Sequence, residues 1–338
     1  MKKHTLEHFA VSSALLAMLL SASAGLAQRT VPAPLARHYS PLPVSQATVQ
    51  SAQPSGSTYT YTLFDFPGTF YTFGTAINVH GSSSKLKVVG GYGNAPLLGN
   101  DSFLMDMTEH KAVTTEAYQT INVPGAPEQS AFGVNEAGQI VGEYVDSSGI
   151  YHGWELSGGT FTTIDVPFSG ASGTGANGIN DSGEIVGGWD GSGTSQHGFT
   201  LIGGTYTSFD YPGAIQTNAW SLNNKGDIVG YWVDTSGVLH GFLLSGGTYA
   251  SFDPPGSVWT VPTGIDDAGD IVGGYCTTAE CVEDLNGVQG FLLSQGTFAT
   301  FTIPGATGTA LAAINDQGVI LGGYYDVAGF QHGFLAVP

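Results

Sequence analysis

Arginine is absent from most of this chain. The last one is Arg37, and the only lysines beyond it are Lys85, Lys87, Lys111 and Lys225. The 338 residues carry a formal net charge of −19. Nucleic acids and acidic membrane surfaces are bound through dense positive charge, and phosphate or sialic acid is usually held by guanidinium groups. The composition therefore argues against all of these as partners.

Long apolar runs are also missing, apart from one near the N-terminus. That run, Phe9 to Leu20, follows Lys2 and Lys3 and precedes a stretch of small residues. It is too short to span a bilayer, and this order of segments is typical of a secretory signal peptide. We therefore predict that residues 1–27 are a signal peptide and that the protein is secreted, to the periplasm or out of the cell, without membrane insertion. An uncleaved anchor is the alternative.

Cysteine is limited to Cys276 and Cys281, which lie close together in one inserted loop. In an oxidising compartment the two could form a small local disulfide ring. The alternative is a thiol or metal pair, but other soft ligands are lacking nearby. We predict the disulfide.

A segment rich in Pro, Ser, Ala and Gln occupies residues 28–57 and shows no apolar periodicity. Such a segment cannot bury enough apolar surface to offset the entropy lost on ordering. We therefore predict a flexible linker at 28–57, followed by one folded domain at 58–338.

The predicted domain repeats one unit. Its most regular copy contains GINDSGEIVGGW (Gly178 to Trp189) and QHGFTLIGGTYTSFDYPG (Gln196 to Gly213). A period in the forties built of short strands is typical of a β-propeller. The central Asn or Asp of the unit recurs at Asn78, Asn135, Asn180, Asn223, Asp266 and Asn315.

Each copy divides into four short runs separated by turn residues. In the third copy the runs are 176–180, 183–189, 196–201 and 205–211. The Gly203-Gly204 pair between the last two runs predicts a tight hairpin, and Pro212-Gly213 ends the fourth run. Each copy is therefore expected to form a four-stranded antiparallel blade.

The two ends of the domain complement each other. The sixth copy stops at Pro338 without a fourth strand, whereas Thr58 to Pro67 reads as a fourth strand with no blade before it. Pairing this segment with Gln331 to Leu335 would remove two open sheet edges. We predict an all-β, six-bladed β-propeller that is closed by the N-terminal strand completing the last blade, and a monomer. An open array of stacked hairpins is the structural alternative.

The recurring His-Gly-Phe tripeptide is flanked by Ile-Asn-Asp-x-Gly and Ile-Val-Gly-x-Tyr segments. This arrangement resembles the bacterial HAF-type extracellular repeat family, which is named for a His-Ala-Phe tripeptide. The resemblance covers nearly all of residues 58–338. This chain has Gly where the family name has Ala, and it lacks the histidine at Gln289 and around Ser102. The resemblance implies secretion and a repeat structure, and it transfers no catalytic residues.

Four copies carry the same histidine and the same preceding acid. The histidines open the third strand, and each acid lies six or seven residues earlier, so that a short hairpin could bring the carboxylate to the imidazole. Because four copies repeat the pair, we interpret it as a structural bond rather than a catalytic or metal site. The pairs are Asp146 with His152, Asp190 with His197, Asp234 with His240, and Asp326 with His332.

Acids also occupy the Ile-Asn turns, at Glu136, Asp181, Asp267 and Asp316. Carboxylates are ligands for Ca²⁺, but the alternating Asp spacing of a dedicated calcium loop is missing. We interpret these residues as solvated turn acids and expect no cofactor, with calcium as the weaker alternative.

Positions that break the repeat are better candidates for function, because residues that recur in every copy are explained by their role in the fold. The loops expected on one face carry aromatic rings beside amides and carboxylates, a combination that suits neutral sugar rings or peptides. The alternative is that these rings pack between blades. The candidate ligand-binding residues are Phe70, Tyr71, Glu128, Gln216, Asn218, Trp220 and Trp259.

The function predicted from these features is a secreted binding or scaffold module that recognises an extracellular polysaccharide or protein through the face that carries the loops. The alternative is a glycan-active enzyme, a glycosidase or lyase, with loop carboxylates such as Glu128 and Glu283 as acid and base. The sequence contains no motif that pairs two such acids, so we favour the binding module and name no catalytic residue.

Overall fold

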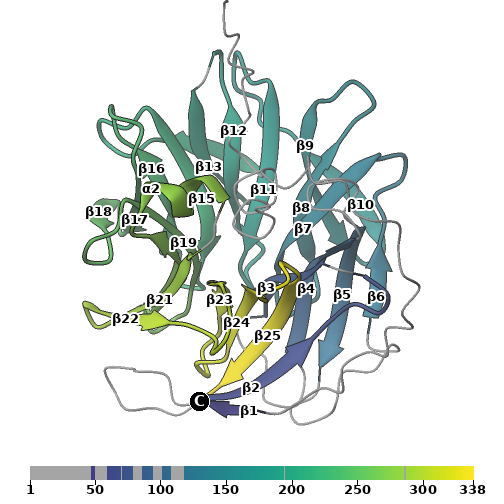
Figure 1. Ribbon diagram of the computed structural model, residues 1–338. Coiled ribbons are helices and arrows are strands. Elements are labelled where there is room, and N and C mark those ends of the chain that lie inside the picture. The colour runs from purple at the N-terminus through teal and green to yellow at the C-terminus, as the bar shows by residue number, and fades with distance from the viewer. Residues whose placement is uncertain are drawn as a thin grey trace, which may run out of the picture.

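The computed structural model describes residues 47–49, 59–69, 71–78, 86–93, 101–107, 118–193, 195–284 and 287–338. The predicted signal peptide and most of the predicted linker lie outside these ranges. Within them the protein is an all-β fold with one short helix, α2 (Ala279–Asp284), which lies in the loop that carries the cysteines (Figure 1). No helix of the described ranges is long and apolar enough to cross a membrane.

The strands form four-stranded antiparallel units, as the repeat predicts. The first unit contains β3 (Tyr71–Ile77), β4 (Leu86–Gly93), β5 (Asp101–Met107) and β6 (Tyr118–Ile121). The second contains β7 (Glu128–Val134), β8 (Ile140–Val145), β9 (Tyr151–Ser157) and β10 (Thr160–Ile164). The third contains β11 (Gly173–Ile179), β12 (Ile185–Asp190), β13 (Gln196–Ile202) and β14 (Thr205–Phe209).

The remaining strands follow the same order. The fourth unit contains β15 (Gln216–Leu222), β16 (Ile228–Val233), β17 (Leu239–Ser245) and β18 (Thr248–Phe252). The fifth contains β19 (Trp259–Ile265), β20 (Ile271–Cys276), β21 (Gln289–Ser294) and β22 (Thr297–Phe301). The sixth combines β23 (Gly308–Ile314), β24 (Ile320–Tyr325) and β25 (Gln331–Val337) with β2 (Tyr59–Phe64) from the other end of the chain.

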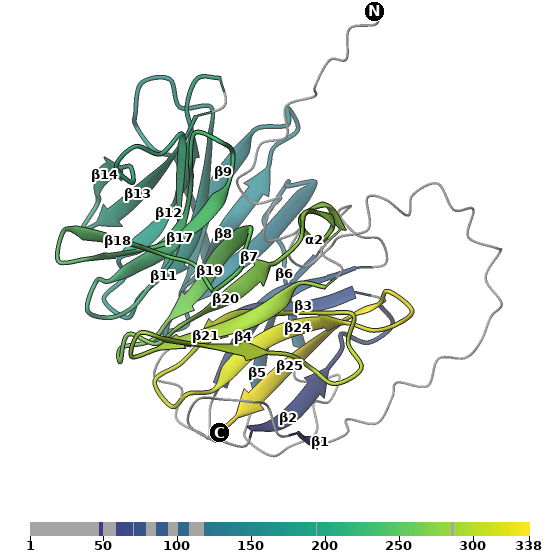
Figure 2. The ribbon, with the colours of Figure 1, turned by 60° about the vertical axis from the view of Figure 1, so that its left-hand side comes forward.

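The pairing of β2 with β25 joins the two ends of the described chain. Its register places Thr62 opposite Leu335 and Phe64 opposite Gly333, and the two strands lie side by side in both views (Figures 1 and 2). A further strand, β1 (Ala47–Val49), pairs with β2. It falls within residues 28–57, the range that the sequence analysis assigns to a linker.

The glycine of the repeated Ile-Val-Gly pattern lies on the second strand of a unit, close to the backbone of the first strand. In the third unit the first strand has an irregular register between Ala176 and Gly178. A Cβ atom added at Gly187 on the neighbouring strand would lie 2.0 Å from the carbonyl oxygen of Gly175, closer than any real contact. Gly230 stands in the same relation to the carbonyl of Asn218. Only glycine fits at these positions, because the neighbouring backbone approaches too closely.

The first strands of all the units converge on one small cavity of about 40 Å³, which has room for water and little else. Residues from β3, β7, β11, β15, β19 and β23 line it, and β3 also contacts β23, β24 and β25 of the sixth unit. The apolar core is divided into clusters, most of which lie between successive units. The first strands are therefore the inner strands, and the fourth strands are the outer ones.

Candidate functional site

The two tryptophans expected on an exposed loop face are buried instead. Trp220 lies on β15 with 3% of its surface exposed, and Trp259 lies on β19 with 4% exposed. Both belong to an apolar cluster with Phe73, Phe132 and the disulfide, and the ring of Phe132 meets that of Trp220 edge to face at 6.1 Å. The inner strands come close enough for rings from different units to touch, so these two rings are not available to stack on a ligand.

The other candidate residues of that face differ in how far they are buried. Glu128 is exposed at the start of β7, Tyr71 and Gln216 are half-buried at the starts of β3 and β15, and Asn218 is fully buried. Asn218 accepts a hydrogen bond from Asn177 Nδ2 at 2.8 Å, which gives it a structural contact between units. Phe70 and the side chain of Glu283 lie outside the described residues.

Cys276 and Cys281 form a disulfide that closes the loop around α2, with an S–S distance of 1.98 Å. Both residues are buried in the same apolar cluster as Trp220 and Trp259. The inserted loop therefore covers the end of the inner strands on that side.

Each repeated histidine contacts an aspartate that the sequence analysis did not single out. The Nδ1 atom of His152 lies 2.9 Å from Asp165, and that of His197 lies 2.8 Å from Asp210. His240 and Asp253 are 2.7 Å apart at the same atoms, and His332 and Asp65 are 2.9 Å apart. These aspartates directly follow the fourth strand, so each bond fastens the third strand to the exit of the fourth.

The predicted acids are weaker partners of the same rings. Asp146, Asp234 and Asp326 lie between 3.5 and 3.7 Å from the Nε2 atoms of His152, His240 and His332. Asp190 differs, because it accepts a hydrogen bond from Gln196 Nε2 at 3.2 Å. Each of the four imidazoles also stacks on an aromatic ring of the second strand, namely Tyr144, Trp189, Trp232 or Tyr324.

The bond between His332 and Asp65 joins residues 267 positions apart and yields a pH-dependent prediction. Burial lowers the pKa of His332, but hydrogen bonds and charges from Asp65 and Asp326 outweigh burial and leave that pKa raised. A raised histidine pKa adds stability below the ordinary value, and this stability is lost as the pH rises through the raised value. His332→Gln should therefore lower the free energy of unfolding by about 1–2 kcal/mol near about pH 6, and by less near about pH 9.

Urea unfolding followed by circular dichroism at both pH values measures this difference. His152→Gln is the matched control, because its bond to Asp165 lies within one hairpin and leaves the terminal strand β2 in place. An equal loss for His332→Gln at the two pH values would contradict the assigned origin of the pKa shift.

The turn acids connect neighbouring units instead of standing alone in solvent. The backbone N–H of Glu136 donates to Asp181 Oδ1 at 2.8 Å, and that of Asn224 donates to Asp267 Oδ1 at 2.8 Å. Asp267 N–H donates in turn to Asp316 at 2.9 Å. Among the described residues, no three His, Cys, Asp or Glu side chains converge as metal ligands would.

A buried acid escaped the sequence analysis. Glu143 on β8 is 6% exposed and stands where other units have glycine, such as Gly188 and Gly274. Tyr231 occupies the same place in the fourth unit, and its hydroxyl donates to Gln196 Oε1 at 2.7 Å. Burial raises the pKa of the neighbouring Asp190. Glu143 and Tyr231 both stand at the second glycine position of the Ile-Val-Gly-Gly pattern. These departures from the repeat are the sequence signal that could have pointed to the contact between Tyr231 and Gln196 of the preceding unit.

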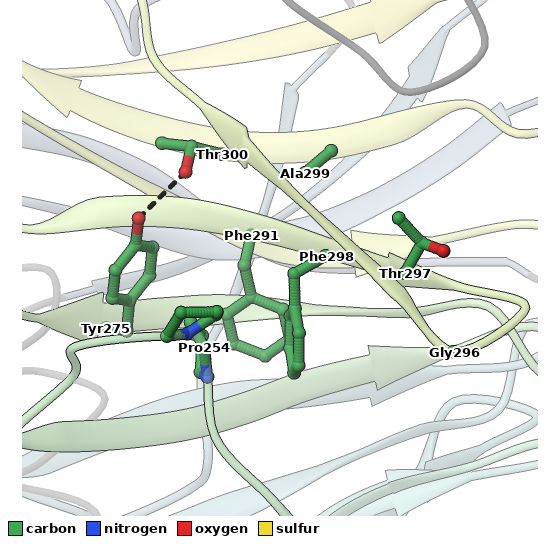
Figure 3. A pocket seen from close by; sticks show the side chains of 9 residues that line it. Pro254, Tyr275, Phe291, Gly296, Thr297, Phe298, Ala299 and Thr300 are labelled. Carbon is green, nitrogen blue, oxygen red and sulfur yellow. Dashed lines mark hydrogen bonds between the residues drawn. The ribbon is translucent and has the colours of Figure 1, made fainter.

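A groove lies on the outer part of the fifth unit. It has a volume of about 500 Å³, within the range of roughly 300–1,000 Å³ that is usual for ligand pockets. Three aromatic rings, of Tyr275, Phe291 and Phe298, form its walls beside Pro254 (Figure 3). The remaining lining residues are Pro255, Gly296, Thr297, Ala299 and Thr300.

The corresponding groove of other units is occupied by the chain itself. In the first unit, Phe66 from the preceding linker stacks on Tyr92 with ring centroids 3.5 Å apart. In the fourth unit, Tyr211 stacks on Trp232 at 4.3 Å. Pro254 holds this position in the fifth unit, where it is buried against Tyr275 and Phe291, which are 5% and 0% exposed.

Comparisons with known proteins bear on the fold. No family model matches the chain, and the search of curated proteins found no match. A putative TolB from Agrobacterium tumefaciens superposes with a TM-score of 0.50 at 12% identity, over 79% of this chain and 91% of that one. A mutant of AofleA from Arthrobotrys oligospora gives 0.49 at 12% identity, over 87% and 91%. A fucose-recognising lectin of Aleuria aurantia, described as a six-bladed β-propeller, gives 0.42 at 11% identity, over 77% and 93%.

These structural neighbours are β-propellers. At such low identity the resemblance shows the fold alone, so the ligands of the neighbours are not transferred to this chain. The four-stranded antiparallel units described above agree with that fold.

Proposed function

We propose that this chain is a secreted binding module of the HAF-type repeat family, folded as a closed six-bladed β-propeller. The apolar N-terminal segment with its two lysines supports secretion. The pairing of β2 with β25 and the contact of β3 with the sixth unit support closure. In this arrangement each four-stranded unit is one blade.

The observation that carries the proposed binding function is the groove of the fifth unit. Pro254 stands there in place of the aromatic residue that stacks on the first and fourth units, and Phe298 is half-buried at the edge of the groove. Its lining contains no charged side chain, which suits a neutral part of an extracellular polysaccharide or protein. The lining also contains no carboxylate, whereas glycoside hydrolysis needs two of them about 5–9.5 Å apart. The groove is therefore better suited to binding than to that catalysis.

Substitution of the groove walls tests this function. Phe298→Ala removes one wall, and we expect the variant to lose at least tenfold in retention of its ligand from cell-wall fractions or culture proteins, measured by pull-down with the mature chain. Tyr249→Ala is the matched control, because Tyr249 occupies the equivalent place in the fourth unit, where Tyr211 covers it at 5.4 Å. Equal retention by the wild type and Phe298→Ala would rule out the groove as the binding site.

A further inference from the structure

The groove of the fifth unit runs along the outer strand of that unit. Consecutive lining residues, 296–300, belong to β22 and to the turn before it. Among the described strands, β22 pairs with β21 and with no other, and it lies at the periphery of the molecule (Figure 1). An outer strand of this kind presents backbone N–H and C=O groups that can pair with a strand of another chain.

The hairpin between β21 and β22 determines which backbone groups of β22 face outward. Its two turn residues, Gln295 and Gly296, both have positive φ, 50° and 77°. In such a hairpin the pair next to the turn, which includes Thr297, is hydrogen-bonded, and hydrogen-bonded pairs then alternate with pairs that are not. Phe298 and Thr300 belong to the pairs without hydrogen bonds. The N–H and C=O groups of these two residues therefore point to the open edge.

The same two residues line the groove with their side chains (Figure 3). Phe298 is half-buried and Thr300 is exposed. Ala299, which lies between them, is 5% exposed and packs in an apolar cluster with residues of the sixth unit, because successive side chains of a strand point to opposite faces. A strand added to the edge of β22 would therefore place every second side chain on the face that carries the groove.

The sixth unit already carries an added strand at the corresponding edge. β1 pairs with β2 in antiparallel orientation and places Ala47 opposite Tyr61. Tyr61 holds the position in β2 that Phe298 holds in β22, because each lies three residues before the phenylalanine that pairs with the glycine of the third strand. β1 consists of Ala-Thr-Val and carries no charge. An outer edge of this protein can therefore accept a short, uncharged strand.

We infer that the fifth unit binds an extended, uncharged segment of a partner protein, which adds to the edge of β22 as a fifth strand and lies along the groove. Backbone hydrogen bonds to Phe298 and Thr300 hold such a strand, and the groove selects its side chains. The lining has no charged side chain, and the net charge of −19 disfavours acidic segments. This inference rests on the proposed binding function and names protein as the ligand, because a polysaccharide lacks the regularly spaced backbone groups that pair with a strand.

Thr300→Pro tests the inference, because proline removes the outward N–H of residue 300 without taking a donor from the pairing of β21 with β22. Thr300→Val is the matched control: it loses the hydroxyl that pairs with Tyr275 at 2.8 Å but keeps the N–H. Ser251→Pro makes the same change in the fourth unit, since Ser251 pairs with Phe242 as Thr300 pairs with Phe291. Circular dichroism checks that each variant is folded.

The main probe is the blocked hexapeptide Ser-Gln-Ala-Thr-Val-Gln, the sequence around β1. One analogue is N-methylated at Ala and Val, whose amides face the edge in the β1 register, and a control analogue is N-methylated at Thr, whose amide faces away. Each is titrated into the isotopically labelled mature chain and followed by NMR at millimolar concentration, as is a neutral glucan oligosaccharide. We expect the hexapeptide to shift the amide signals of Phe298 and Thr300. Its affinity should fall at least about tenfold in Thr300→Pro and in the Ala/Val-methylated analogue, but not in Thr300→Val or Ser251→Pro.

The outcomes separate the inference from the function on which it rests. Equal binding of the two methylated analogues to the wild type would overturn the inference even if Thr300→Pro failed to fold. Signal shifts confined to β2 or β18, or no shift at all, would overturn it as well. Binding of the oligosaccharide that Phe298→Ala abolishes, with no binding of the hexapeptide, would overturn the inference and keep the proposed function. Retention of wall and culture ligands that Phe298→Ala leaves unchanged would overturn both.

Discussion

Phe64→Ala is expected to lower the free energy of unfolding by about 3–5 kcal/mol, the range typical of a buried phenylalanine. Phe64 lies on β2, is 2% exposed, and belongs to an apolar cluster with Phe103 and Leu335. A Cβ atom added at Gly333 on β25 would lie 2.3 Å from its ring. The ring therefore fills the space above the glycine and holds together the two ends of the chain.

Phe64→Ala should have a second effect that the equivalent substitution in another unit lacks. Phe209 packs in the same way over Gly198 in the third unit, but there the two strands are joined by the tight hairpin at Gly203 and Gly204. Phe209→Ala should remove packing only. Phe64→Ala should also release β2, because no hairpin connects β2 to β25. The chain that links these two strands is the rest of the domain.

Urea unfolding with intrinsic fluorescence measures both variants, and limited proteolysis reports release of the N-terminal strand. We expect earlier cleavage between residues 58 and 70 in Phe64→Ala than in Phe209→Ala. The same packing argument predicts that a chain truncated before residue 68 unfolds at a lower urea concentration than either variant. A truncated chain with the stability of the wild type would show that β2 does not hold the sixth unit together.

The part of the fold that could be predicted is local and repeated. The Gly203-Gly204 hairpin has both glycines at positive φ, 56° and 80°, as its turn type requires. Every other copy has four strands, so the lack of a fourth strand after β25 and the presence of an extra strand, β2, before β3 predicted that these two strands pair. Local turn chemistry and the count of strands per copy were enough for the pairing of β2 with β25.

The candidate site was harder to predict because it depends on contacts between units. The sequence places Trp220 in a first strand, but it does not show how closely the first strands approach one another, so exposure of this ring was expected wrongly. The aspartates that bind the histidines, such as Asp210, directly follow the fourth strand, thirteen residues from the histidine. The sequence does show that Pro254 stands where the fourth unit has Tyr211, but the effect of that change depends on how the rings of the second to fourth strands pack around it.

The turn asparagines of the second, third and fourth units donate to the backbone of the next unit, whereas the fifth unit has Asp266 at this position. Asn135 Nδ2 donates to the carbonyl of Asn180 at 3.0 Å, and Asn223 Nδ2 donates to that of Asp266 at 3.0 Å. Asp266 has no amide to donate onward, although its Oδ1 accepts from Asp270 N–H at 2.8 Å like the oxygen of the asparagines. It is 3% exposed, so a carboxylate takes the place of an amide in a buried position.

Burial raises the pKa of Asp266 to about 6, from 3.8, and nearby Asp270 and Asp316 add to the effect against hydrogen bonds that lower it. The carboxyl therefore stays protonated in the folded state at pH values where it ionises in the unfolded state. Below about pH 4 both states are protonated and there is no penalty. Between about pH 4 and 6 the penalty grows, and above about pH 6 it is complete at about 3 kcal/mol.

Asp266→Asn should consequently raise the free energy of unfolding by about 2–3 kcal/mol at neutral pH, and by little at about pH 4. The amide removes the buried charge and restores a donor toward the sixth unit, as in the other copies. Urea unfolding across this pH range gives the difference between variant and wild type, in which the titration of all other groups cancels. Asn180→Asp is the reverse control and should lose stability over the same range, because Asn180 is fully buried and donates to Asn223 at 3.3 Å. A difference between Asp266→Asn and the wild type that stays flat from about pH 4 to 8 would mean that Asp266 is ionised in the fold without penalty.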